Sequence, residues 1–146
     1  MKEKKDILAI CVDIHAATKI LSVSKNKVYM MGGFLTPYGA SSCDFAAEFT
    51  KQISSIDLFL CSADGIDPLS GFTSDEVWIN DLKKYYISVA KKTIVLADHT
   101  KFTKSSFYRM CDFADIDLLV TDEGTPDVIL SELAERGLKQ WIKVPL

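Results

Sequence analysis

The chain has 146 residues, of which 48% are hydrophobic and 25% charged, and its formal net charge is -3. This composition is typical of a globular chain that buries a core in one domain, and the acidic balance excludes a basic nucleic-acid-binding surface. The four cysteines form no C-x-x-C pair and there are two histidines, so we expect no metal site and no cofactor. The apolar run ILAICV (7–12) is too short for a signal peptide or a membrane span, which predicts a reduced, cytoplasmic protein without membrane contact.

Short apolar runs alternate with helix-prone stretches along the whole chain. The runs predict strands over 7–12, 27–31, 56–61, 93–97, 116–121 and 140–144. The stretches between them predict helices over about 14–22, 40–52, 74–91 and 126–136. Near-continuous apolar strands are typical of a parallel sheet that is buried on both faces, and alternation with helices indicates an α/β sandwich with right-handed crossovers. We therefore predict a single domain over 1–146, with a flexible start at 1–6.

Two of the predicted helices carry recognisable end signals. The helix over 74–91 follows a T-x-x-E capping box formed by Thr73 and Glu76. Its apolar side chains recur at spacings of three and four, which predicts one packed face: Trp78, Leu82, Tyr85 and Val89. In the last helix, Pro126 suits a first-turn position and Gly137 suits a C-terminal stop.

Polar clusters follow three of the predicted strands. Asp64-Gly65 comes after the strand at 56–61, Asp98–Lys101 after 93–97, and Thr121–Gly124 after 116–121. In open α/β sheets, ligands bind beyond the carboxyl ends of the strands, so neighbouring parallel strands would bring the three clusters to one rim. The alternative is that Asp, Gly and Thr are simply common turn residues.

The cluster at 98–101 has a chemistry that suits a sugar derivative. The Asp98 carboxylate can accept hydrogen bonds from sugar hydroxyls, and Lys101 can neutralise a carboxylate or phosphate. His99 fits either an exposed turn or a ligand contact. The chain contains no G-x-G-x-x-G fingerprint, no phosphate-binding P-loop and no G-x-S-x-G elbow, so dinucleotide, nucleotide and hydrolase functions lack support.

Four segments together resemble the effector-binding domain of DeoR-family transcriptional regulators. They read VYMMGGFLTP (28–37), SADGIDPLSGFTS (62–74), TIVLADHTKF (93–102) and DIDLLVTDEG (115–124). The resemblance extends over nearly the whole chain from about residue 7. It implies a three-layer Rossmann-like sandwich with a mostly parallel sheet, related to ribose-5-phosphate isomerase and to glucosamine-phosphate isomerases. It also implies a domain that senses phosphorylated sugars.

The same resemblance implies which residues bind the effector. Positions that match the family pattern are Asp64, Gly65, Thr73, Lys84, Asp98, Lys101 and Phe102, and His99 lies within the same pocket element. The chain departs from the pattern at Ser62, where the family has glycine, and at His99, where it has serine. A larger residue and an imidazole at these positions would change the shape and chemistry of the pocket.

Two elements of the family pattern are missing from the chain: the N-terminal winged helix-turn-helix and the first strand with its serine-glycine-threonine phosphate loop. We therefore expect an N-terminally truncated sensor that forms homo-oligomers and contacts DNA only through a winged helix outside this chain. An isomerase is the first alternative, but Lys83 stands where such enzymes have a catalytic glutamate, so we expect no enzyme and no catalytic residue. A ligand-free oligomerisation module is the second alternative.

Overall fold

The computed structural model describes residues 4–37, 39, 41–42 and 48–145. Contacts divide the chain into two compact units, Met1–Gln52 and Ile53–Leu146, and each unit is described here by itself. The expected single-domain organisation stays a prediction, and residues 1–3 of the expected flexible start lie outside the described residues. No helix in the described part of the chain is long and apolar enough to cross a membrane.

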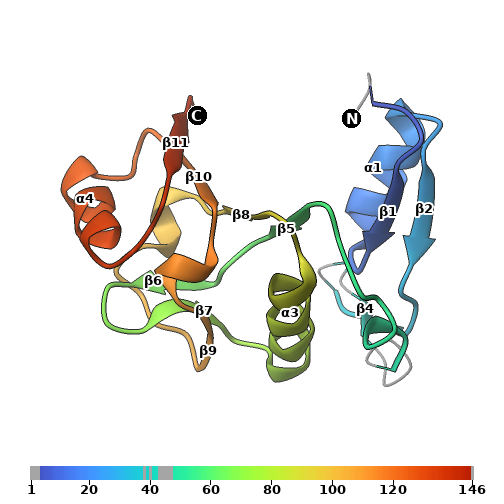
Figure 1. Cartoon of the computed structure of the whole chain (residues 1–146), viewed down its shortest axis with the longest axis horizontal. Coiled ribbons are helices and arrows are strands. Elements are labelled where there is room, and N and C mark those ends of the chain that lie inside the picture. Colours follow the sequence, from blue (N-terminus) through green and yellow to red (C-terminus); the bar gives the residue numbers. More distant parts are fainter. Residues whose placement is uncertain (1–3, 38, 40, 43–47, 146) are drawn as a thin grey trace. The chain divides into compact units, whose positions relative to one another are not determined.

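The first unit is built on two parallel strands and one helix (Figure 1). Strand β1 (Leu8–Cys11) pairs with β2 (Lys27–Met30), and α1 (Ile14–Val23) connects them, as predicted. The helix begins at Asp13, whose carboxylate accepts a hydrogen bond of 2.6 Å from the Ala16 amide.

A short antiparallel pair follows, formed by β3 (Phe34–Leu35) and β4 (Ser41–Ser42). The predicted helix over 40–52 is wrong at its start, because two of its residues form β4. Residues 48–50 are helical, and residues 43–47 lie outside the described residues. The antiparallel pairing of two short polar and apolar stretches replaced the local helical tendency here.

A parallel sheet of four strands forms the centre of the second unit. Its order is β11 (Trp141–Val144), β10 (Leu118–Asp122), β8 (Thr93–Leu96) and β5 (Phe59–Cys61). In Figure 1 these neighbours change from green at β5 to dark red at β11. All three pairings are parallel, so the predicted Rossmann-like α/β fold with a mostly parallel sheet is confirmed. Each of the four apolar runs predicted after residue 53 overlaps one of these strands, and β10 extends one residue beyond its run.

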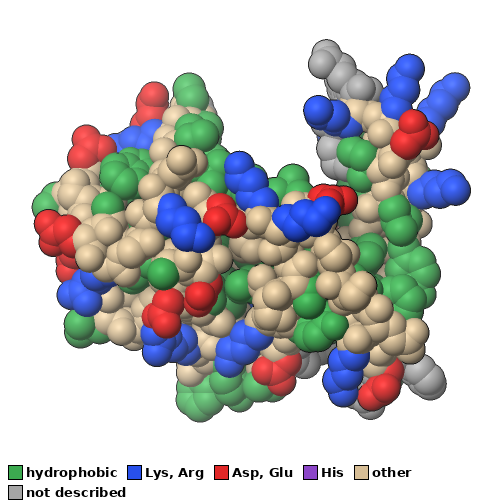
Figure 2. Space-filling view, viewed as in Figure 1, with side chains coloured by type: hydrophobic (Ala, Val, Ile, Leu, Met, Phe, Trp, Pro, Cys, Tyr) green, Lys and Arg blue, Asp and Glu red, His purple; other side chains and the backbone are tan. Residues whose placement is uncertain are grey.

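The sequence did not predict a second sheet in this unit. It is antiparallel and consists of β6 (Gly65–Asp67), β7 (Gly71–Ser74) and β9 (Tyr108–Cys111), in that order. One cluster of buried residues joins the two sheets and α4 (Asp127–Glu135); it includes Ile66, Phe72, Val95, Leu119, Leu130 and Leu133. On the face shown in Figure 2, acidic and basic side chains of this unit are interspersed over the surface.

Helix α3 (Val77–Val89) differs from its prediction at both its start and its packed face. It begins after Glu76, which provides no side-chain cap, whereas Thr73 belongs to β7, so the predicted capping box is wrong. The helix buries Asn80 and Tyr86, while the predicted face is only half-buried at Leu82, Tyr85 and Val89. The side chain of Trp78 lies outside the described residues. By contrast, α4 starts directly after Pro126 and is followed by Gly137 at a φ of 108°, in agreement with the predicted signals.

Candidate functional site

The carboxyl ends of three neighbouring strands form the rim at which the polar clusters lie. Because β5, β8 and β10 are adjacent and parallel, the segments that follow them leave the same edge of the sheet. The segment after β8 forms a short 3-10 helix, η1 (His99–Lys101). The structure directly joins this helix to the cluster that follows β10.

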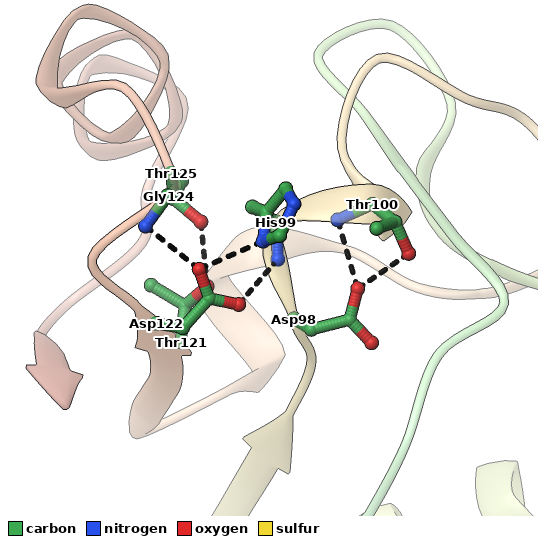
Figure 3. Close-up of polar contacts among 7 residues, drawn as sticks. All are labelled: Asp98, His99, Thr100, Thr121, Asp122, Gly124 and Thr125. Carbon is green, nitrogen blue, oxygen red and sulfur yellow. Dashed lines mark hydrogen bonds and ion pairs between the residues drawn. The ribbon is translucent and has the colours of Figure 1, made fainter. Parts of the chain in front are cut away.

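Asp122, the last residue of β10, holds the two segments together (Figure 3). Its side chain is only 7% exposed. One carboxylate oxygen, Oδ2, accepts the His99 backbone N–H at 2.8 Å. The other oxygen, Oδ1, accepts the Gly124 N–H at 2.7 Å and lies 2.9 Å from Nδ1 of the His99 ring. Nearby, the hydroxyls of Thr121 and Thr125 are hydrogen-bonded at 2.7 Å.

The protonation of Asp122 follows from these contacts. Burial of the carboxyl group works against its charged form, but the hydrogen bonds from His99 and Gly124 outweigh burial and hold the pKa of Asp122 below its usual value. The ionised carboxylate can only accept hydrogen bonds, so Nδ1 of His99 carries the hydrogen that is shared with Asp122. In the neutral ring, Nε2 is therefore an acceptor.

Asp98 starts η1 and lies on the open side of the rim. Its Oδ1 accepts the Thr100 backbone N–H at 2.8 Å and also a hydrogen bond from the Thr100 hydroxyl. The hydroxyl and backbone hydrogen bonds from Thr100, together with the positive charge of Lys101, lower the pKa of Asp98. Asp98 is thus ionised at neutral pH, and its second oxygen makes no hydrogen bond within the described part of the chain.

Lys101, the last residue of η1, and Phe102, which follows it, have different surroundings. Lys101 is half-buried, and among the described residues its ammonium group forms no hydrogen bond or salt bridge. Phe102 is 3% exposed and belongs to the core, where it forms an isolated bridge with Ile66 of β6. The structure therefore places Lys101 at the rim, whereas Phe102 anchors the segment beneath it.

Asp64 and Thr73, two of the predicted ligand residues, make internal hydrogen bonds. The Asp64 carboxylate accepts the Ser74 hydroxyl at 2.9 Å and the Asp75 N–H at 3.1 Å, so it organises the turn before α3. The Thr73 hydroxyl donates to the Gly65 carbonyl at 3.1 Å and accepts the Ser106 N–H at 2.8 Å. Both hydrogen-bonding roles of Thr73 are thus used inside the protein.

Gly65 lies between two parts of the chain that approach each other closely. A Cβ atom at this position would lie 2.6 Å from the Lys104 carbonyl oxygen and 2.6 Å from the Thr73 hydroxyl oxygen. Only glycine fits this approach without movement of the backbone. The structure places Gly65 and Thr73 behind the rim, as supports for the loop that follows η1.

Lys84 does not join the other predicted site residues. It is exposed and lies beside a shallow surface hollow that is also lined by Ile87, Ser88, Met110, Cys111 and Asp115. Lys83, one residue earlier, donates a hydrogen bond of 2.8 Å to the Ser62 carbonyl, directly after β5. Adjacent helical residues point about 100° apart, so an error of one residue moves the ammonium group off the rim. Asn80, Lys83 and Tyr86 recur at i, i+3 spacing, and this spacing is the feature of the sequence that indicates the helix face directed toward the sheet.

Asp98, His99 and Asp122 each offer a donor atom within 4.8 Å of the other two. Their arrangement is nevertheless that of a hydrogen-bonded pair rather than of a metal centre, because both oxygens of Asp122 already accept N–H donors. We therefore do not treat them as metal ligands. The rim presents a free carboxylate oxygen, an imidazole and an ammonium group, a combination that suits a hydroxylated anion.

A parallel sheet with a polar rim at its carboxyl ends places the chain among the α/β domains, a class in which ligands bind at this edge of the sheet. The profile of the DeoR C terminal sensor domain matches residues 1–123, so the chain belongs to this family, as the sequence motifs predicted.

Curated relatives agree with this assignment. The chain is 27% identical to the putative aga operon transcriptional repressor of Escherichia coli O157:H7, over 95% of this chain and 52% of that protein. It is 27% identical to the transcriptional repressor AccR of Agrobacterium fabrum, over 97% of this chain and 55% of that protein. It is 29% identical to the HTH-type transcriptional repressor GlcR of Bacillus subtilis, over 90% of this chain and 50% of that protein. The chain thus spans about half the length of these relatives, all of which are named as transcriptional repressors.

Proposed function

We propose that the chain is the effector-sensing part of a DeoR-type repressor and binds a phosphorylated sugar at the carboxyl-terminal rim of its parallel sheet. The observation that carries this proposal is the position of η1, which brings Asp98, His99 and Lys101 together at the rim. Hydrogen bonds between His99 and Asp122 hold this segment in place. A named relative adds support, because the chain is 27% identical over 110 residues to the glycerol-3-phosphate regulon repressor of Haemophilus influenzae.

Each group at the rim has a role in this proposal. Lys101 neutralises the phosphate, since its ammonium group has no protein partner among the described residues. Asp98 accepts hydrogen bonds from sugar hydroxyls through its free oxygen. Lys83 contributes a second ammonium group from the side of β5. Effector binding would then change the DNA affinity of a winged helix-turn-helix outside this chain, in the cytoplasm.

Binding without turnover is part of the same proposal. An isomerase of related fold needs a carboxylate that moves a proton between neighbouring carbons, and here Lys83 occupies the corresponding position. Its ammonium group donates to a backbone carbonyl and is not a base. Incubation with ribose 5-phosphate should therefore give no ketose, and clear turnover by the purified chain would contradict the sensor function.

Thermal unfolding with a ligand panel tests the proposal directly. The panel contains glycerol 3-phosphate, ribose 5-phosphate, glucose 6-phosphate and N-acetylgalactosamine 6-phosphate, each beside its unphosphorylated counterpart. A ligand at 100 times its Kd should stabilise the chain by about 2.7 kcal/mol, which raises the Tm by several degrees. If no phosphorylated compound shifts the Tm at millimolar concentration, the proposed function is wrong.

Lysine variants then locate the phosphate. Lys101→Met should weaken binding of the active compound at least tenfold, because it removes the ammonium group to which the proposal assigns neutralisation of the phosphate. Lys83→Met should also weaken binding, whereas Lys84→Met and Lys104→Met should bind as the wild type does. Normal binding by Lys101→Met would contradict the role of this residue. Loss of binding by Lys84→Met would support the ligand role that the family pattern implies for Lys84.

We also propose that the chain forms homo-oligomers. Leu60, Leu96 and Ile142 are exposed large apolar residues, and the strand register places them on the same face of the parallel sheet. Light scattering coupled to size-exclusion chromatography tests this proposal. A Leu96→Lys variant should shift an oligomer toward monomer, and a monomeric wild-type chain would contradict the proposal.

A further inference from the structure

The imidazole of His99 has one nitrogen directed into the protein and one that is not. Nδ1 lies 2.9 Å from the buried Asp122 carboxylate, while the side chain as a whole remains 43% exposed. Since the backbone N–H of the same residue also binds Asp122, the ring is fixed by two neighbouring attachments. No described protein group forms a hydrogen bond with Nε2. In Figure 3 the ring lies between the Asp122–Gly124 segment and the Asp98–Thr100 segment.

The backbone of Gly124 leaves the ring little freedom to move. A Cβ atom at Gly124 would lie 2.7 Å from Nδ1 of His99 and 2.8 Å from Oδ1 of Asp122. The absence of a side chain at this position therefore lets the ring and the carboxylate meet. Both the position and the tautomer of His99 are consequently set by its surroundings.

Charged groups from two elements surround the ring. Asp122 faces it from β10, and Asp98 and Lys101 come from η1 itself, while Gly124 contributes only backbone. When the ring is neutral, Nε2 can only accept a hydrogen bond. When the ring takes up a proton, Nε2 becomes a charged donor on the same short helix as Lys101, and two cationic groups suit the oxygens of a phosphate.

We propose that His99 is a specificity-determining contact of the effector site, donating from protonated Nε2 to a phosphate oxygen, so that effector binding is coupled to proton uptake. This inference rests on the proposed sensor function. The proton taken up stays on the imidazole and is released when the effector leaves, and no covalent bond changes. A phosphate dianion would then be preferred over neutral sugars and more strongly so as the pH falls from 8 toward 6.5.

Calorimetry on the purified chain measures this coupling. The panel compound that binds most tightly is titrated at pH 6.5 and pH 8.0, and at pH 7.5 in two buffers of different ionisation enthalpy. We expect the affinity of the wild type to rise about tenfold between pH 8.0 and 6.5, which corresponds to one charge-assisted hydrogen bond. The buffer pair should reveal proton uptake of roughly half a proton at pH 7.5.

His99→Asn is the matched variant, because its amide N–H can replace Nδ1–H toward Asp122 but cannot take up a proton. It should bind at pH 8.0 within about threefold of the wild type. It should show no proton uptake, but only the small proton release expected when a phosphate whose second pKa is about 6 binds as its dianion. Gly124→Ala should lose the same coupling, because the new methyl group displaces the ring.

The outcomes separate this inference from the proposed function. If His99→Asn binds the effector with the same pH dependence and proton uptake as the wild type, the inference is wrong and the sensor function stands. Full proton uptake by Gly124→Ala would refute the role of ring orientation. If the wild type binds no panel compound at either pH, the proposed function and this inference fall together.

Discussion

Replacement of Thr73 by valine should destabilise the second unit without removing a ligand contact. Thr73 is 1% exposed, and its hydroxyl donates to the buried Gly65 carbonyl at 3.1 Å and accepts the Ser106 N–H at 2.8 Å. Valine has nearly the same shape but offers neither hydrogen bond. The variant therefore removes one hydrogen bond from a carbonyl on β6 and one from an N–H on the loop after η1, and replaces neither.

The expected magnitude follows from the burial of those two groups. Removal of a hydrogen bond from a buried carbonyl such as that of Gly65 costs about 1–3 kcal/mol. The Ser106 N–H is only partly buried and can reach water, so it adds about 1 kcal/mol. We expect Thr73→Val to lower the free energy of unfolding by about 2–4 kcal/mol, which moves the urea midpoint by roughly 1–2 M.

Thr73→Ser is the matched control. It keeps the hydroxyl and loses one methyl group, so it should cost only about 1 kcal/mol. Urea unfolding followed by circular dichroism measures both variants, and calorimetry with the active panel compound measures binding. A Thr73→Val variant within 0.5 kcal/mol of the wild type would refute the reasoning, as would a serine variant that folds normally but loses the ligand.

Two further predictions concern stability. Gly65→Ala should lower the free energy of unfolding by about 1–3 kcal/mol, because its methyl group meets the Lys104 carbonyl oxygen, and a loss below 0.5 kcal/mol would contradict this. The side-chain hydrogen bond from Lys139, and after it the hydrogen bond from the Thr93 backbone N–H, lower the pKa of Asp117. Ionised Asp117 therefore stabilises the fold above its unfolded-state pKa of about 3.9. This stabilisation is lost as the pH falls through the folded-state pKa. Asp117→Asn should therefore lower the Tm at pH 7, by a difference that shrinks as the pH falls below about 3.9 and through the folded-state pKa; a difference that stays constant over this range would argue against the ion pair.

The parallel strands could be predicted because each of them lies in a nearly continuous apolar run, even on the sheet face where Leu60, Leu96 and Ile142 remain exposed. Their adjacency then placed the clusters at 98–101 and 121–124 on one rim, where the structure joins them through His99 and Asp122. The strands β6, β7 and β9 have three or four residues each and lack a regular alternation, so only tertiary pairing stabilises them. Their absence from the prediction explains why the sequence predicts a helix cap at Thr73, which lies in β7.

The buried face of α3 could not be predicted from the sequence, for a different reason. Two lysines and two tyrosines stand in adjacent pairs at Lys83-Lys84 and Tyr85-Tyr86, so two neighbouring helix faces have nearly the same polarity. The face that packs is decided by contacts distant in sequence, such as the hydrogen bond from Asn80 to the Arg109 carbonyl. Spacing alone could not distinguish the two faces.

The hydrogen bonds to Asp122 also bear on the entropy of effector binding. Three N–H groups already converge on this carboxylate before any ligand is present, so the segment after β8 and the segment after β10 are held in one conformation. A pocket that is ordered in advance loses less conformational freedom when it is occupied, and this raises affinity for a ligand as small as a single sugar. Under the proposed sensor function, the signal to a winged helix-turn-helix outside this chain would come from a part of the sensor other than this rim.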